Sequence, residues 1–207
     1  MDTTSNVTNN DQSGDDRHVI ATYLSDMLAL ERHIAQPVDS QLKSGDHQSF
    51  GDAIRIIQQI KTCTENHVSA LESQLSAVGG NAASPIKSAW AALLGTGAAA
   101  INQVRKTKVS KSLRDDYTAL SLSAISYTML HATAVGLGDT ATAQLAKRHL
   151  DDYAKVIVDI SKAMPTVVLQ ELRDDGENVQ VSAAHFTEQE TGDSWRSSNV
   201  GGGSTAK

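Results

Sequence analysis

Four side chains that could do chemistry lie on or beside the apolar stripes of predicted helices: Glu31, His67, His149 and Asp152. Carboxylates and imidazoles are the ligands with which helical bundles bind iron or manganese, and they also form hydrogen-bonded networks in protein cores. His149 and Asp152 stand three residues apart, so one helix face carries both, as in a metal-binding pair. The residue types therefore allow two kinds of site, a reduced mononuclear metal site and a buried polar network.

Glu31 and His67 are the two members that fall on apolar stripes. Glu31 stands three residues before Ile34, where a carboxylate must be paired, hydrogen-bonded or bound to a cation. A rim position explains Glu31 equally well, with a salt bridge to Arg32, to His33 or to a lysine of a neighbouring helix. His67 is predicted as a hydrogen-bonded core histidine, which is commoner than a metal ligand at such a position.

The other two members, His149 and Asp152, have charged neighbours. Lys147 and Arg148 precede the pair, and Asp151 lies inside it. A solvated charged helix face explains this composition more simply than a ligand pair does. The sequence therefore predicts that the pair lies on the flank of its helix.

The third predicted helix lacks acidic residues: from Tyr117 to Gly138 it contains no Asp or Glu. A carboxylate-bridged pair of metal ions takes an inward carboxylate from each of four helices, and this helix supplies none. Its inner residues Tyr117 and Tyr127, together with Tyr153 of the fourth helix, are predicted as core side chains whose hydroxyl groups find partners. The sequence thus predicts that a complete di-metal site is absent.

The composition of the chain argues against several classes of function. Its 207 residues carry a formal net charge of −6, and they contain no clustered basic face of the kind that binds nucleic acid. The single cysteine, Cys63, cannot form an intramolecular disulfide, and there is no nucleophile or phosphate-loop motif. Because neither a signal peptide nor a long apolar run occurs, we expect a cytoplasmic protein that binds neither nucleic acid nor membrane.

Helical periodicity organises the chain. Apolar residues three and four positions apart predict four long helices, over about residues 17–43, 49–78, 112–135 and 140–164. Pro37 predicts a kink or a short break in the first helix. Pro165 limits the fourth helix, and residues 167–172 form a candidate further turn. Asp139 or Thr140 is the predicted cap of the fourth helix.

The remaining segments are less regular. Residues 81–110 are rich in Ala and Gly and predict one or two short helices that cross the bundle. Residues 1–16 and 176–207 are polar and are predicted to be disordered tails. The predicted organisation is therefore one helical domain, residues 17–175, between two tails.

The order of several sequence motifs resembles the YciE/YciF group of ferritin-like bacterial stress proteins over about residues 18–176. The motifs are YLSDMLALERHIAQPVDSQL, HVSALESQLSAVGG, KSAWAALL, SYTMLHATAVGLGD, QLAKRHLDDYAKVIVDI and VVLQELRDDG. The resemblance implies an all-α fold, a ferritin-like antiparallel four-helix bundle with short crossing helices between the second and third long helices. It also implies a homodimer.

The same resemblance implies a degraded metal site. Glu31 and His67 fall on the usual Glu and His of the group, but Ala70 stands where the second helix commonly carries a Glu. Ser123 and its neighbours occupy the region of the third helix where acidic positions are expected. Asp151 and Asp152 replace a Glu pair in the fourth helix, and Asp is shorter by one methylene group. These departures favour a bundle with little or no metal-binding capacity.

Three functions are consistent with the sequence. The leading hypothesis is a non-catalytic or metal-poor ferritin-like protein without a cofactor, with a stress-related role implied by the resemblance, which acts as a homodimer or as a scaffold for an unidentified protein partner. Glu31, His67 and Asp152 would form its core polar network. The alternative is an iron-dependent oxidoreductase or iron-handling protein with Glu31, His67, His149 and Asp152 as ligands. A third possibility is a helical binding module that uses residues 88–101 as a partner groove.

Overall fold

The chain folds into a bundle of helices. A computed structural model describes residues 5–44, 49–81 and 108–197. The described residues contain no strand. They form four long helices, α1 (Ser5–Lys43), α3 (Gly51–Ala77), α5 (Val109–Gly136) and α6 (Thr140–Asp174), and a shorter helix, α7 (Ala183–Ser197). The predicted all-α fold is confirmed.

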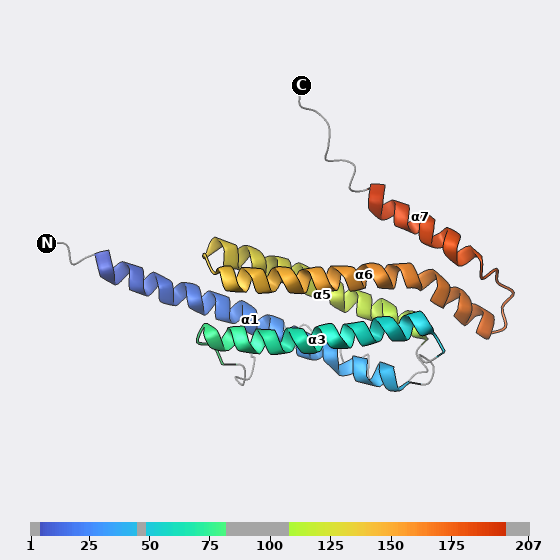
Figure 1. The fold of residues 1–207 in the computed structure, drawn as a ribbon, viewed down its shortest axis with the longest axis horizontal. Coiled ribbons are helices and arrows are strands. Elements are labelled where there is room, and N and C mark those ends of the chain that lie inside the picture. The colour runs from blue at the N-terminus through green and yellow to red at the C-terminus, as the bar shows by residue number, and fades with distance from the viewer. Residues whose placement is uncertain (1–4, 45–48, 82–107, 198–207) are drawn as a thin grey trace, which may run out of the picture.

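The four long helices pack antiparallel to their neighbours. α1 contacts α3 and α5, and α6 contacts the same two helices, so α1 and α6 occupy one diagonal of the bundle and α3 and α5 the other (Figure 1). α3 and α5 run in the same direction, and α3 therefore ends at the opposite end of the bundle from the start of α5 (Figure 1). The short helices predicted for residues 81–110, and the groove predicted at residues 88–101, fall almost entirely outside the described residues.

The core follows the apolar stripes. Leu24 and Leu28 of α1, Ile56 and Ile60 of α3 and Leu120 of α5 are fully buried. Burying an aliphatic side chain of this size contributes roughly 1.5–3 kcal/mol to folding, so these stripes fix which face of each helix points inward. None of the described helices combines the length and the apolar character needed to span a lipid bilayer.

Turn chemistry fixes the ends of the helices. Gly79 after α3 and Gly138 after α5 have φ angles of 85° and 75°, a backbone conformation that favours glycine. Asp139 caps α6, because its side chain accepts a hydrogen bond from the backbone N–H of Thr142 at 2.9 Å. The predicted cap is confirmed.

Both long helices that contain a proline are continuous through it. α1 runs on past Pro37 to Lys43, and α6 runs past Pro165 to Asp174, so the predicted limit at Pro165 is wrong. Buried packing beyond each proline offsets the lost hydrogen bond, because Val38 is 1% exposed and Val167 is 2% exposed.

Glu171, in the last turns of α6, links this helix to the start of α5. Its carboxylate accepts hydrogen bonds from the backbone N–H of Ser110 at 2.9 Å and from the Ser110 hydroxyl. The residue before α5, Lys108, provides no side-chain cap of its own. A carboxylate at a helix N-terminus satisfies an unpaired N–H and interacts favourably with the helix dipole. The extension of α6 beyond Pro165 therefore stabilises α5 as well.

Helices extend into both segments that the sequence predicts as tails. α1 begins at Ser5, well before Arg17, and α7 lies within residues 176–207. For α1, adding turns to the start of an existing helix avoids the cost of nucleation, which explains why these first turns are helical without an apolar stripe. α7 packs on α6 with Ala184 buried, whereas Phe186 is 61% exposed. The predicted limits of the domain, residues 17–175, stay a prediction.

Candidate functional site

Glu31 of α1 lies at the centre of the bundle, where it is fully buried. The Tyr127 hydroxyl of α5 donates a hydrogen bond to Glu31 Oε1 at 2.7 Å, and the Tyr153 hydroxyl of α6 donates to Glu31 Oε2. Both carboxylate oxygens are thus occupied by phenol donors. A buried carboxylate needs such donors, because it has lost its hydration.

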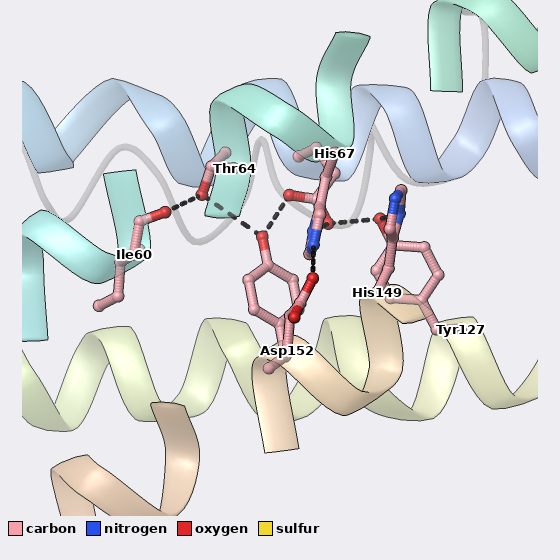
Figure 2. Close-up of polar contacts among 8 residues, drawn as sticks. Ile60, Thr64, His67, Tyr127, His149 and Asp152 are labelled. Atoms are coloured by element: carbon pink, nitrogen blue, oxygen red, sulfur yellow. Dashed lines mark hydrogen bonds and ion pairs between the residues drawn. The ribbon is translucent and has the colours of Figure 1, made fainter. Parts of the chain in front are cut away.

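His67 of α3 connects Glu31 to the surface. His67 Nδ1 lies 3.4 Å from Glu31 Oε1, and Nε2 lies 3.2 Å from Oδ2 of Asp152 on α6 (Figure 2). The His67 side chain is 1% exposed and that of Asp152 is 55% exposed. Each ring nitrogen of His67 therefore faces one carboxylate oxygen. The contacts form a continuous polar chain from solvent to Glu31.

His149 of α6 stacks on His67. The ring centroids are 3.8 Å apart and the rings are inclined by 13°. Burial, and next the charge of His67, lower the pKa of His149 to about 3, so its ring is neutral at neutral pH. His149 Nδ1 lies 3.0 Å from the Tyr127 hydroxyl. Because Tyr127 gives its proton to Glu31, His149 Nδ1 is the donor in this contact.

The two tyrosines remain protonated donors. Burial, and next the charge of Glu31, raise the pKa values of Tyr127 and Tyr153 above that of an ordinary tyrosine. The Tyr153 oxygen also lies 3.4 Å from the hydroxyl of Thr64, which donates to the Ile60 carbonyl at 2.7 Å (Figure 2). The network therefore ends in the backbone of α3. The prediction that core tyrosine hydroxyls find partners is confirmed for Tyr127 and Tyr153, whereas Tyr117 is only partly buried.

The structure brings all four sequence-predicted site residues together, and Glu31, His67 and Asp152 are linked in a polar network as predicted. Glu31 is fully buried and not at the rim, and Arg32 pairs with Glu72 instead, at 2.7 Å. The predicted solvated face is wrong for His149, which is 5% exposed. It is correct for Asp152, whose side chain is 55% exposed, and for Asp151, whose side chain is 60% exposed and pairs with Lys147. These contacts do not test the assignment of the four residues as metal ligands.

As arranged, the side chains do not fit a metal ion. Both oxygens of Glu31 already accept hydrogen bonds from tyrosines. Imidazole lone pairs lie in the ring plane, so the stacked rings of His67 and His149 direct theirs along nearly parallel planes and not to one point. In the described ranges, no three His, Cys, Asp or Glu side chains form a group that could hold an ion. A metal would require the tyrosines to withdraw and the rings to separate.

Ser123 of α5 occupies the region where the family resemblance expects acidic residues. It is fully buried, and within the described part of the chain its hydroxyl oxygen has no hydrogen-bond partner. Ser123 therefore makes no hydrogen bond to Glu31, whereas Tyr127, one turn later, does. The third helix thus contributes a phenol and not a carboxylate to the centre of the bundle.

A second buried polar cluster, which the sequence analysis missed, joins α1 to α5. Gln41 Nε2 donates hydrogen bonds to Ser112 Oγ and to Asp116 Oδ1, both at 2.9 Å. Asp116 is 7% exposed. Its spacing from Leu113 and Leu120, three and four residues, is the signal that places it on the inner stripe.

Fold and site together define a class, an all-helical bundle with a buried carboxylate–tyrosine–histidine network at its centre. The chain belongs to the family described as "Domain of unknown function (DUF892)", whose model matches residues 16–173.

A solved structure supports the same fold. A protein from Xanthomonas campestris pv. campestris is similar over 79% of this chain and 99% of its own, with a TM-score of 0.63 and 17% sequence identity. At this identity the likeness shows the fold alone. A comparison with the curated proteins gives no match.

Proposed function

We propose that this protein is a non-catalytic, ferritin-like bundle of the YciE/YciF type, in which a hydrogen-bonded network takes the place of a metal pair. One observation carries the proposal: Tyr127 and Tyr153 donate to the two oxygens of Glu31, the atoms that a metal would otherwise contact. In this role the network specifies how α1, α3, α5 and α6 pack, since each of these helices contributes a member. The family resemblance supports a stress-related role in the cytoplasm.

The proposed protein works as a homodimer that pairs through the outer face of α5. Ile125 and Met129, one turn apart on this face, are 57% and 49% exposed. From Tyr117 to its end at Gly136 the helix has no Asp, Glu, Lys or Arg. Two such faces could pack together without burying an unpaired charge, and interface cores are depleted in charged residues. A second copy of the chain is therefore a suitable partner.

Sedimentation velocity of the full chain tests the dimer. We expect a dimer for the wild type and a monomer for the double variant Ile125→Glu, Met129→Glu, because a charge is costly in an apolar interface. Val158→Glu on α6 is the matched control, since Val158 is also 49% exposed. A monomeric wild type, or a double variant that stays dimeric, would contradict the proposed interface.

An iron-handling protein or iron-dependent oxidoreductase is the second candidate. The convergence of Glu31, His67, His149 and Asp152 supports it, because these residues come from three helices and meet in one network. This function requires the rearrangement described above, in which Glu31 exchanges its tyrosine donors for a cation.

Metal content decides between the two candidates. The full chain is incubated with Fe(II) under anaerobic conditions, desalted and measured by mass spectrometry. We expect folded protein without stoichiometric iron. Retention of about one or two irons per chain, lost in Glu31→Gln, would overturn the proposal and make Glu31 a ligand.

A further inference from the structure

The cluster of Gln41, Ser112 and Asp116 contains two acceptors that nothing satisfies. Gln41 Oε1 and Asp116 Oδ2 are both buried and have no hydrogen-bond partner in the part of the chain that the structure describes. Both belong to the amide–carboxyl pair whose other atoms, Gln41 Nε2 and Asp116 Oδ1, are 2.9 Å apart. Leaving a buried acceptor unpaired costs about 1–3 kcal/mol, so two in one pair point to a missing donor.

We propose that the missing donor is a proton on Asp116, which the carboxyl group gives to Gln41 Oε1 to close a cyclic amide–acid pair between α1 and α5. One proton satisfies both acceptors at once. The conclusion does not depend on which way the amide is turned. If the Gln41 oxygen and nitrogen exchange places, two oxygens face each other at 2.9 Å, and that contact also needs a proton between them.

The surroundings of Asp116 favour its neutral form. Burial, the largest effect, raises its pKa to about 7; the hydrogen bond from Gln41 opposes this shift, and the charge of the next residue, Asp115, adds to it. Asp115 is itself paired with Arg114, at 2.7 Å.

Three acidic groups on or beside the neighbouring helices pair with residues other than Asp116. On α1, Asp39 is held by Lys61 of α3 at 2.6 Å. On α6, Glu171 accepts from Ser110, and Asp175, which follows this helix, pairs with Lys108. Among the described residues, the contacts therefore offer no cation to keep Asp116 ionised.

The Gln41–Asp116 pair acts as a pH-dependent contact between α1 and α5, which weakens as the pH rises. Its folded-state pKa lies above the ordinary value, so between about pH 4 and pH 7 the folded chain holds a proton that the unfolded chain has released. Stability from this group is therefore complete at low pH and is lost as the pH rises toward 7. Above that pH the buried carboxylate repels Gln41 Oε1, and the contact between α1 and α5 loosens.

A carbon-13 NMR titration of the Asp116 carboxyl group in the full-length protein tests the protonation directly. We expect a midpoint near 7. A midpoint near the ordinary value of about 4 would overturn the proposal, and a water molecule that donates to both acceptors would then be the explanation.

Urea unfolding of Asp116→Asn provides the second test. Asparagine resembles the protonated acid, because its amide group donates to Gln41 Oε1 at every pH. We expect the folding equilibrium constant of the wild type, relative to Asp116→Asn, to fall roughly tenfold for each pH unit between about pH 5 and 7. Asp115→Asn is the control and should change this slope little, since Asp115 is an exposed neighbour. A ratio of the two folding equilibrium constants that stays the same across this pH range would contradict the proposed pH-dependent contact.

Discussion

The bundle buries two carboxyl groups in different ways. Glu31 at the centre has three neighbours that can donate, Tyr127, Tyr153 and His67, and none of its oxygens is left without a partner. Asp116, between α1 and α5, receives one hydrogen bond and leaves one oxygen unpaired. The difference teaches that burial alone does not decide the chemistry of a carboxyl group. The number of donors around it does.

Removing the Glu31 carboxylate should produce the largest effect and break the central cluster. Glu31→Ala leaves two phenol hydroxyls and a histidine without their shared acceptor in a dry core, so we expect a loss of about 3–5 kcal/mol in the free energy of unfolding. Urea denaturation followed by circular dichroism measures it. Glu31→Gln, which keeps one acceptor, should lose only about 1–2 kcal/mol. Equal losses of unfolding free energy in Glu31→Ala and Glu31→Gln would show that the hydrogen bonds to Glu31 do not account for the stability of the central cluster.

The sequence located Glu31 and His67 because each stands among apolar residues at helical spacing. It placed His149 on a flank because Lys147, Arg148 and Asp151 around it lower the average hydropathy of the segment. His149 is nevertheless four residues from Leu145 and from Tyr153, which are both buried. Phase relative to buried neighbours, and not local composition, decides which side chain points inward.

The sequence grouped Glu31, His67 and Asp152 in one network, but the hydrogen bonds of the tyrosines to Glu31 could not be predicted in the same way. Tyr127 and Glu31 are 96 positions apart in the sequence, and their hydrogen bond depends on how α1 and α5 are aligned. Periodicity gives the inward face of each helix but not how far one helix is shifted along the bundle axis relative to another. The limit of α6 at Pro165 was wrongly predicted for a related reason, because the tertiary packing that offsets the lost hydrogen bond is not local.

Acid should expose a second contrast between the two clusters. The folded-state pKa of His149 is about 3, below its ordinary value, so the unfolded chain binds an extra proton between about pH 6.5 and pH 3. His149 therefore stabilises the protein above this window, and its contribution is lost as the pH falls, the opposite direction to Asp116.

Urea unfolding at a series of pH values measures this effect of His149. We expect His149→Gln to remove a slope of about 1.4 kcal/mol per pH unit from the acid side of the stability profile. Gln is chosen because its amide group can still donate to the Tyr127 hydroxyl. An unchanged acid slope would mean that His149 is already charged in the folded protein.

The two tyrosines should differ in how much they support the network. Tyr127→Phe removes the donor to Glu31 and the acceptor for His149, so we expect a loss of about 2 kcal/mol. Tyr153→Phe removes the donor to Glu31 and only a long contact to Thr64, and we expect about 1 kcal/mol. Thermal and urea unfolding of both variants check the order. A larger loss of stability for Tyr153→Phe would contradict this order and would mean that the hydrogen bond from Tyr153 to Glu31 is the stronger of the two.

A carboxylate at the surface completes the series with the smallest effect. Asp151 lies next to Asp152 in the sequence, but its side chain is 60% exposed, and both of its oxygens lie 2.6 Å from the Lys147 ammonium group. Water already solvates both partners, so Asp151→Asn should cost less than about 0.5 kcal/mol, and added salt should reduce the difference further. Urea unfolding at low and high ionic strength measures both quantities. A loss as large as that of Glu31→Ala would contradict the prediction, because it would mean that exposure to water does not reduce the contribution of a carboxylate to stability.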